Sequence, residues 1–309
     1  MSRKNRRQFF RTFTATLGAP AVILALKKTG QLPLSFSTLG CPQWDWKTIL
    51  EQASRSGYSA IEFRGIKGQM DLTRCPEFGP ARVSQSLQDL KALGLCIINL
   101  GSSAQMHEKE PSARAAHMDE GRRFIDLAHR LSAPYIRVFG DKYVEGETRQ
   151  ETLSRVVAGL QELGGYAKSA GVTVLLESHG DFHDSPTLLR ILKGADMPSV
   201  ALLWDTHHTF VSGKESPATT FSQLGSYVRH THLKDSKPVG NDVRYVLTGT
   251  GTIPLQEIVR VLAKGGYKGY YSFEWEKAWH PEIDEPEVAI PQYAKTMREY
   301  LARAGVTAS

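Results

Sequence analysis

Four short apolar runs in the second half of the chain each end in an acidic residue or a histidine. The residues at these ends are Glu177, Asp205, His232 and Glu274. Three carboxylates brought to one place repel each other, and a divalent cation relieves that repulsion. Oxygen-rich ligands with one imidazole suit Mn²⁺, Mg²⁺, Co²⁺ or Zn²⁺ better than a soft metal. The pattern therefore predicts a site for one divalent metal ion, with Mn²⁺ as the first choice.

Two histidines follow these residues closely. His179 comes two residues after Glu177, and His208 comes three residues after Asp205, so both are expected within reach of a bound substrate. One acidic residue at such a position is commonly a helix N-cap. Four in succession favour a functional site, because a carboxylate that faces a protein interior is costly unless it is paired or bound to metal.

The elements that must position these residues repeat regularly from residue 34 onward. The expected strands cover residues 34–38, 60–63, 96–100, 135–139, 173–177, 201–205, 228–233 and 270–274. Amphipathic stretches at 46–56, 81–94, 112–132, 147–170, 186–194, 217–226, 254–265 and 288–304 predict the helices. Eight such repeats predict a single (β/α)8 TIM barrel over residues 31–309. The alternative, a doubly wound sheet, would more often have a glycine-rich loop after its first strand, and residues 37–40 do not form one.

In such a barrel the active site lies at the carboxyl ends of the strands, so side chains that end successive strands converge there. Arg137 ends the fourth strand and is expected either to bind a substrate oxygen or to pair with a neighbouring carboxylate. Glu62 ends the second strand, where structural pairing with Arg64 or another neighbour is the favoured interpretation.

Two further residues follow the seventh and eighth strands. Lys234 either contacts substrate or forms an ion pair with Asp235. Trp275, in an aromatic and acidic segment that continues to Trp279, either stacks on a sugar ring or covers the barrel mouth.

The positive charge of the chain is concentrated at its N-terminus. The whole chain is +6, but residues 1–30 contain seven basic residues and no acidic one. The remaining body has 31 basic and 32 acidic residues. A nearly neutral body gives no electrostatic reason to expect a nucleic-acid partner.

Residues 1–30 are interpreted as an export signal. Residues 5–11, with the pair Arg6 and Arg7, resemble the twin-arginine motif. The apolar stretch that follows is about 15 residues long, shorter than the roughly 20 that a membrane span needs. We therefore expect a periplasmic or otherwise extracytoplasmic protein, anchored to the membrane if the signal stays uncleaved; a basic arm with a surface helix is the alternative.

The three cysteines, Cys41, Cys75 and Cys96, have no CxxC spacing. Free thiols are expected, with one disulfide left open. The sequence does not decide whether the protein forms a homo-oligomer.

From about residue 34 to 304 the chain resembles the sugar phosphate isomerase/epimerase superfamily, the xylose isomerase-like barrels. The matching motifs are Glu177-Ser178-His179, Asp205-Thr206-His207-His208, His232-Leu233-Lys234-Asp235, Gly249-Thr250-Gly251 and Glu274-Trp275-Glu276. The resemblance implies that Glu177, Asp205, His232 and Glu274 bind the metal. It also implies that both glutamates exchange protons with substrate carbon and that His208 contacts a substrate oxygen.

This chemistry predicts a metal-dependent sugar isomerase or epimerase. A base, which is Glu177, Glu274 or His179, removes the proton next to a ketone, and the metal stabilises the enediolate. Export favours an unphosphorylated keto sugar. The leading alternative is a lyase or dehydratase that eliminates a group from a 3-keto-glycoside. An endonuclease IV-like nuclease and a non-catalytic sugar-binding protein are the remaining alternatives.

Overall fold

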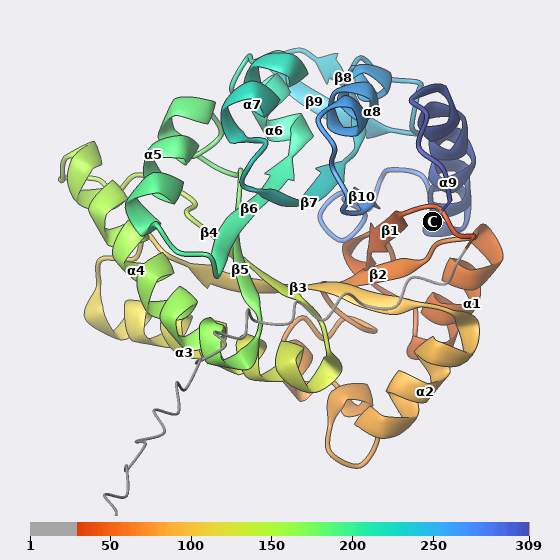
Figure 1. Ribbon diagram of the computed structural model, residues 1–309, viewed down its shortest axis with the longest axis horizontal. Helices are drawn as coiled ribbons and strands as arrows, with labels where there is room; N and C mark the ends of the chain where they lie inside the picture. Colours follow the sequence, from red (N-terminus) through yellow and green to blue (C-terminus); the bar gives the residue numbers. More distant parts are fainter. Residues whose placement is uncertain (1–29, 309) are drawn as a thin grey trace, which may run out of the picture.

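Eight parallel strands form a closed barrel in the computed structural model, which describes residues 30–308 (Figure 1). Their order around the barrel is β1 (Leu34–Ser37), β2 (Ala60–Phe63), β3 (Cys96–Gln105), β4 (Tyr135–Phe139), β5 (Thr173–Glu177), β6 (Val200–Asp205), β7 (Val228–Leu233) and β10 (Tyr271–Phe273). The predicted (β/α)8 barrel is confirmed. The predicted export signal lies outside the described residues, except for Gly30.

Helices surround the barrel (Figure 1). They are α1 (Trp46–Ser56), α2 (Val83–Leu93), α3 (Pro111–Leu131), α4 (Arg149–Ala170), α5 (Ser185–Ala195), α6 (Thr206–Val211), α7 (Pro217–Leu224), α8 (Leu255–Lys264) and α9 (Pro286–Arg303), with short 3₁₀ turns at Thr38–Gly40, Leu72–Arg74 and Pro76–Phe78. Local signals set their ends: the capping box of Thr148 and Glu151 begins α4, and Gly171, with a φ of 67°, ends it.

Besides the short 3₁₀ turns, a helix and a hairpin were not expected from the sequence. The short helix α6 begins directly after β6, capped by the Asp205 side chain. An antiparallel hairpin, β8 (Asp235–Val239) and β9 (Asp242–Val246), follows β7. Within residues 30–308, no helix has both the length and the apolar character needed to cross a membrane.

The main hydrophobic core lies between the barrel and its helices, and smaller apolar clusters fill part of the barrel interior. Leu175, Ala201 and Leu203 form one of these interior clusters on β5 and β6. Because successive strand residues face opposite sides, the residues two positions after Leu175 and Leu203 also point inward. Those residues are Glu177 and Asp205, so the strand alternation places two candidate ligands inside the barrel, next to this apolar cluster.

Candidate functional site

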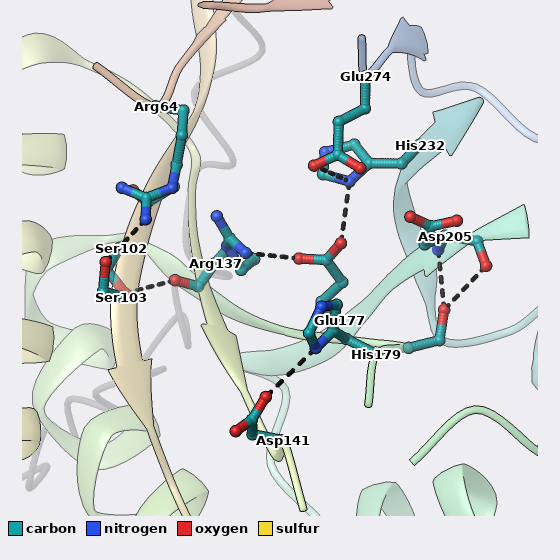
Figure 2. A network of polar contacts seen from close by, with 12 residues as sticks. Arg64, Ser102, Ser103, Arg137, Asp141, Glu177, His179, Asp205, His232 and Glu274 are labelled. Carbon is teal, nitrogen blue, oxygen red and sulfur yellow. Dashed lines mark hydrogen bonds and ion pairs between the residues drawn. The ribbon is translucent and has the colours of Figure 1, made fainter. Parts of the chain in front are cut away.

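The four predicted metal ligands converge inside the carboxyl end of the barrel. One donor atom from each of Glu177, Asp205, His232 and Glu274 lies within 4.8 Å of the others, and all four side chains are buried. His232 Nδ1 is 3.1 Å from Glu177 Oε1 and 3.1 Å from Glu274 Oε1 (Figure 2). Three carboxylates and one imidazole around one point are a donor set that suits a hard or borderline divalent cation, so these residues fit the predicted metal.

Two buried cations hold the outer oxygens of these carboxylates. Arg137 donates from Nη1 to Glu177 Oε2 at 2.8 Å, which is the carboxylate pairing that was one of its two expected roles (Figure 2). Lys234, fully buried, donates to Asp205 Oδ2 at 2.7 Å and also to Glu274. Arg137 and Lys234 therefore each fix one oxygen of a glutamate, leaving the other toward His232 Nδ1. Lys234 also fixes Asp205 Oδ2, while Asp205 Oδ1 accepts from the backbone N–H groups of His207 and His208.

Lys234 has a third carboxylate partner, Glu276 Oε1 at 2.6 Å. The anticipated pairing with Asp235 is replaced, because Asp235 accepts hydrogen bonds from the backbone amides of Gly249 and Gly251 at 2.8 and 2.9 Å. Asp235 thus orders the turn after the hairpin, and Lys234 belongs to the carboxylate cluster.

Burial and these charges shift the pKa values in opposite directions. Burial raises the pKa of Asp205 to about 6, although Lys234 opposes the shift. For Glu274 burial also acts to raise the pKa, but His232 and Lys234 outweigh it and lower the pKa well below the ordinary value. Burial also acts to raise the pKa of Glu177, but Arg137 and His232 together outweigh it, so the pKa is lowered. Both glutamates are therefore ionised at neutral pH, as a metal ligand or proton acceptor must be.

Glu62 lies on the other side of the His232 ring. Its Oε2 is 2.9 Å from His232 Nε2 and 2.9 Å from His230 Nε2, and Asn99 donates to it at 3.0 Å. An ionised carboxylate only accepts, so we assign the proton of His232 to Nε2. This assignment leaves the Nδ1 lone pair available toward Glu177 and Glu274, as in the carboxylate–histidine–metal arrangement of known metal sites.

His179 and His208 lie together at the edge of the site. Their rings are 4.9 Å apart, and His208 Nε2 is 3.6 Å from Asp205 Oδ2. His179 Nδ1 is 3.4 Å from Asp141 Oδ1, which orients its ring beside Glu177 (Figure 2). Both predicted histidines are therefore brought to the site, and both are partly exposed.

Trp275 is not placed where a sugar could stack on it. Its side chain is fully buried, its ring lies 5.5 Å from that of Phe273, and its indole N–H donates to the Asp284 carbonyl. The strand alternation explains this position: Glu274 points inward, so Phe273 and Trp275 point outward toward the helices. The predicted role of Trp275 in substrate binding is therefore corrected to a role in core packing, while Trp279 is 59 % exposed.

Some residues around the site were not predicted from the sequence. Glu276 and His230 continue the same inward alternation as Glu274 and His232, and that signal was present in the sequence. Tyr245 was not foreseeable in this way, because it reaches the site from the hairpin. Its ring lies 5.4 Å from that of His207 and 5.9 Å from Lys234 Nζ.

Comparisons with known proteins give similarity at three levels. A family model described as "Xylose isomerase-like TIM barrel" matches residues 50–303. Inosose dehydratase of Geobacillus thermodenitrificans is 26 % identical over 170 residues, which cover 49 % of this chain and 54 % of that protein. Fructoselysine 3-epimerase of Shigella flexneri is 25 % identical, covering 81 % of this chain and 91 % of that protein. The solved structure of the IOLI protein with a zinc atom has a TM-score of 0.74 at 18 % identity, covering 88 % of this chain and 99 % of that one.

The chain spans only about half the length of the inosose dehydratases that it matches. The similarity to the IOLI structure, at this level of identity, describes the fold.

Proposed function

The chain belongs to the xylose isomerase-like TIM barrel family, and from that premise we propose that it is a divalent-metal-dependent isomerase or epimerase of an unphosphorylated keto sugar. The observation that supports this most directly is the buried cluster of Glu177, Asp205, His232 and Glu274, whose donor atoms lie within 4.8 Å of one another. We assign these four residues as the metal ligands. When bound there, a divalent cation would polarise the ketone oxygen of a sugar and make the neighbouring C–H more acidic.

Residues of this chain would then accept and return the proton on the carbon next to the ketone. Glu177 and Glu274 lie on either side of His232 Nδ1, each 3.1 Å from it, and each has its second oxygen fixed by a cation. We propose that one glutamate accepts the proton next to the ketone, giving an enediolate. Return of a proton from the opposite face gives an epimer, and return to the neighbouring carbon gives an isomer.

A second candidate, elimination from a 3-keto-glycoside, has support from His179. Elimination from the same enediolate needs a proton donor near the leaving group. The partly exposed His179 ring, oriented by Asp141 at 3.4 Å, is such a group at the edge of the site. His208, Arg137 and Lys234 would then position substrate oxygens or the carboxylates that face them.

The test is hydrogen exchange in D₂O with protein supplied with Mn²⁺, against free ketoses and 3-keto-glycosides. Deuterium at the carbon next to the ketone would establish proton abstraction, and release of an alcohol would identify elimination. Chelation with EDTA should abolish exchange, and added Mn²⁺ should restore it. Protein that binds no divalent metal, measured by mass spectrometry without prior chelation, would refute the metal assignment.

Substitution tests the two glutamates separately. We predict that Glu177→Gln and Glu274→Gln each abolish turnover while the fold is kept, because the amide cannot accept the proton. Circular dichroism checks the fold, and Glu215→Gln, away from the metal cluster, is the control. Full activity in either site variant would contradict the mechanism.

We also propose that residues 1–30 export the protein, which would place its substrate outside the cytoplasm. Cell fractionation with an Arg6→Lys, Arg7→Lys variant tests this, since a twin-arginine signal should lose export when both arginines are replaced.

A further inference from the structure

A groove of about 750 Å³ opens between the loops that follow β3 and β4. Its walls include His107 and Lys109 from the first loop and Lys142, Tyr143 and Val144 from the second. Both loops leave carboxyl ends of strands, so the groove lies on the same face of the barrel as the proposed metal centre. Its volume is within the range of about 300 to 1,000 Å³ that is usual for small-molecule sites.

A row of side chains runs from the metal centre to Gln105 and Asp141, which precede the two loops that line the groove. Gln105 donates to Asp141 Oδ2 at 3.2 Å, and Asp141 Oδ1 lies 3.4 Å from His179 (Figure 2 shows the second pair). The His179 ring is 4.9 Å from the His208 ring, which itself approaches Asp205 at 3.6 Å. A molecule longer than one sugar unit would therefore extend from the metal centre past Asp141 toward the groove.

One wall of the groove carries a buried polar side chain that lacks a partner. His107 is 1 % exposed, and among residues 30–308 neither of its ring nitrogens has a hydrogen-bond partner. Nε2 is 3.3 Å from Glu108 Oε1 but is not aligned for a hydrogen bond. Leaving a buried polar atom unpaired is unfavourable, so a ligand that pairs with it would be stabilised. A neutral imidazole offers one donor and one acceptor, which matches a hydroxyl group that both donates and accepts.

The other walls favour an uncharged ligand with apolar faces. The Tyr143 ring is held edge-to-face against Phe182 at 4.9 Å, with the Arg149 guanidinium 4.9 Å from its centre. Its remaining surface and the side chain of Val144 line the groove with carbon of the kind that packs against a sugar ring. The groove is lined by three carboxylates and two ammonium groups. The ammonium group of Lys109 is already paired with a further carboxylate, because it lies 3.6 Å from Glu147. This balance disfavours a phosphate. The charged residues of the groove are Glu108, Glu110, Glu145, Lys109 and Lys142.

We propose that this groove binds the second, uncharged sugar unit of a glycoside whose keto-sugar unit lies at the metal centre. The placement of the keto-sugar unit rests on the proposed function, while the groove itself stands on the residues that line it. The substrate class is thereby narrowed from free keto sugars to glycosides with at least two units.

The experiment compares two substrates of the Mn²⁺-loaded protein, methyl 3-keto-β-glucoside and 3-keto-cellobiose. Tyr143→Ala removes the aromatic wall, and Val144→Trp fills the groove. Tyr166→Ala is the matched control, because Tyr166 is an exposed tyrosine of α4 outside the groove. Both groove variants should lower kcat/KM for 3-keto-cellobiose by about tenfold or more, the usual effect of losing a contact in a pocket. They should change the value for the methyl glycoside much less, and the control should change neither.

Equal losses on both substrates, or no loss on either, would overturn the groove while leaving the proposed function intact. If neither substrate exchanges deuterium, the proposed function fails, and the affinity of the protein for cellobiose then tests whether the groove binds a sugar. Calorimetric titration with cellobiose then measures affinity directly. Weaker binding in Tyr143→Ala but not in Tyr166→Ala would support the groove, and identical binding in all three proteins would overturn it.

Discussion

Glu62→Gln tests how the fold prepares His232 for a metal. In the structure, Asn99 Nδ2, His230 Nε2 and His232 Nε2 all direct N–H donors at one carboxylate, at 2.9–3.0 Å. A glutamine has the same shape but only one acceptor oxygen, and its amide nitrogen is itself a donor. The three donors share Oε2, and His232 Nε2 also lies 3.1 Å from Oε1, so in either orientation of the glutamine its amide N–H₂ group faces His232 Nε2.

The expected fall in Mn²⁺ affinity follows from the loss of the hydrogen bond between His232 Nε2 and an ionised carboxylate. A hydrogen bond to a charged group contributes about 1.5–3 kcal/mol. Because the amide nitrogen faces His232, the ring proton moves from Nε2 to Nδ1, the atom that faces Glu177 and Glu274. A metal must then displace this proton, so we expect Mn²⁺ affinity to fall about 10- to 100-fold, as for other partners that orient metal-binding histidines.

Calorimetric titration of the chelated protein with Mn²⁺ measures the affinity directly. Long-range ¹H–¹⁵N correlation spectra of metal-free protein report which nitrogen of His232 carries the proton. Glu215→Gln is the control, because it also removes a carboxylate, but one that accepts hydrogen bonds from Ser185 and Thr220 and is not among the candidate metal ligands. This variant should bind Mn²⁺ as the unchanged protein does. Unchanged affinity in a folded Glu62→Gln protein would refute this account of the His232 proton.

Three further outcomes are expected. Lys234→Met removes the ammonium group that neutralises the surrounding carboxylates and should cost the metal-free protein about 3–5 kcal/mol, the usual penalty for breaking a buried ion pair. Mn²⁺ should raise the Tm of this variant more than that of the unchanged protein, and equal shifts would contradict this role of Lys234. Burial lowers the pKa of His107, so the unfolded chain takes up a proton that the folded one does not, and stability should fall as pH drops below about 6.5; urea unfolding of His107→Leu should show a shallower pH slope, and parallel slopes would count against it. Burial raises the pKa of Cys75 to about 12, so its thiolate fraction, and hence its alkylation by iodoacetamide at pH 8, should be about 1,000-fold lower than for an ordinary thiol; rapid labelling of the folded protein, detected by mass spectrometry, would show otherwise.

The barrel itself was predictable because its strands carry a strong local signal. Runs such as residues 173–177 are buried on both faces and read as nearly continuous apolar segments. The expected free thiols are also confirmed for Cys41 and Cys75, which are buried. The third strand runs to Gln105, beyond the expected residue 100, because β4 extends the pairing: Phe139 lies opposite Gln105. Such pairing depends on a neighbour that is distant in sequence, so the local pattern did not contain it.

The β8–β9 hairpin shows why other parts of the fold and the site could not be predicted from the sequence. Residues 235–246 contain Pro238 and Gly240, both unusual inside strands, and most of the segment is exposed, so it lacks a clear apolar alternation. Its contribution to the site, Tyr245, was therefore hidden. Glu276 is a different case: its inward position follows from the same alternation as Glu274, although β10 ends at Phe273. For such a residue, the inward–outward alternation of the strand predicts the side-chain direction even beyond the last residue of the strand.

The site draws its parts from different stretches of the chain. Glu177, Asp205, His232 and Glu274 come from strand ends in the second half, whereas the groove comes from loops between residues 106 and 148 in the first half. Strand ends are held by the hydrogen-bonded barrel, and loops tolerate insertion and replacement far better. The proposed metal chemistry and the proposed preference for long substrates are therefore encoded in separate parts of the sequence. Transplanting the two loops onto a related barrel would be expected to move the preference for long substrates without moving the chemistry, which is a route by which one ancestral barrel can diversify.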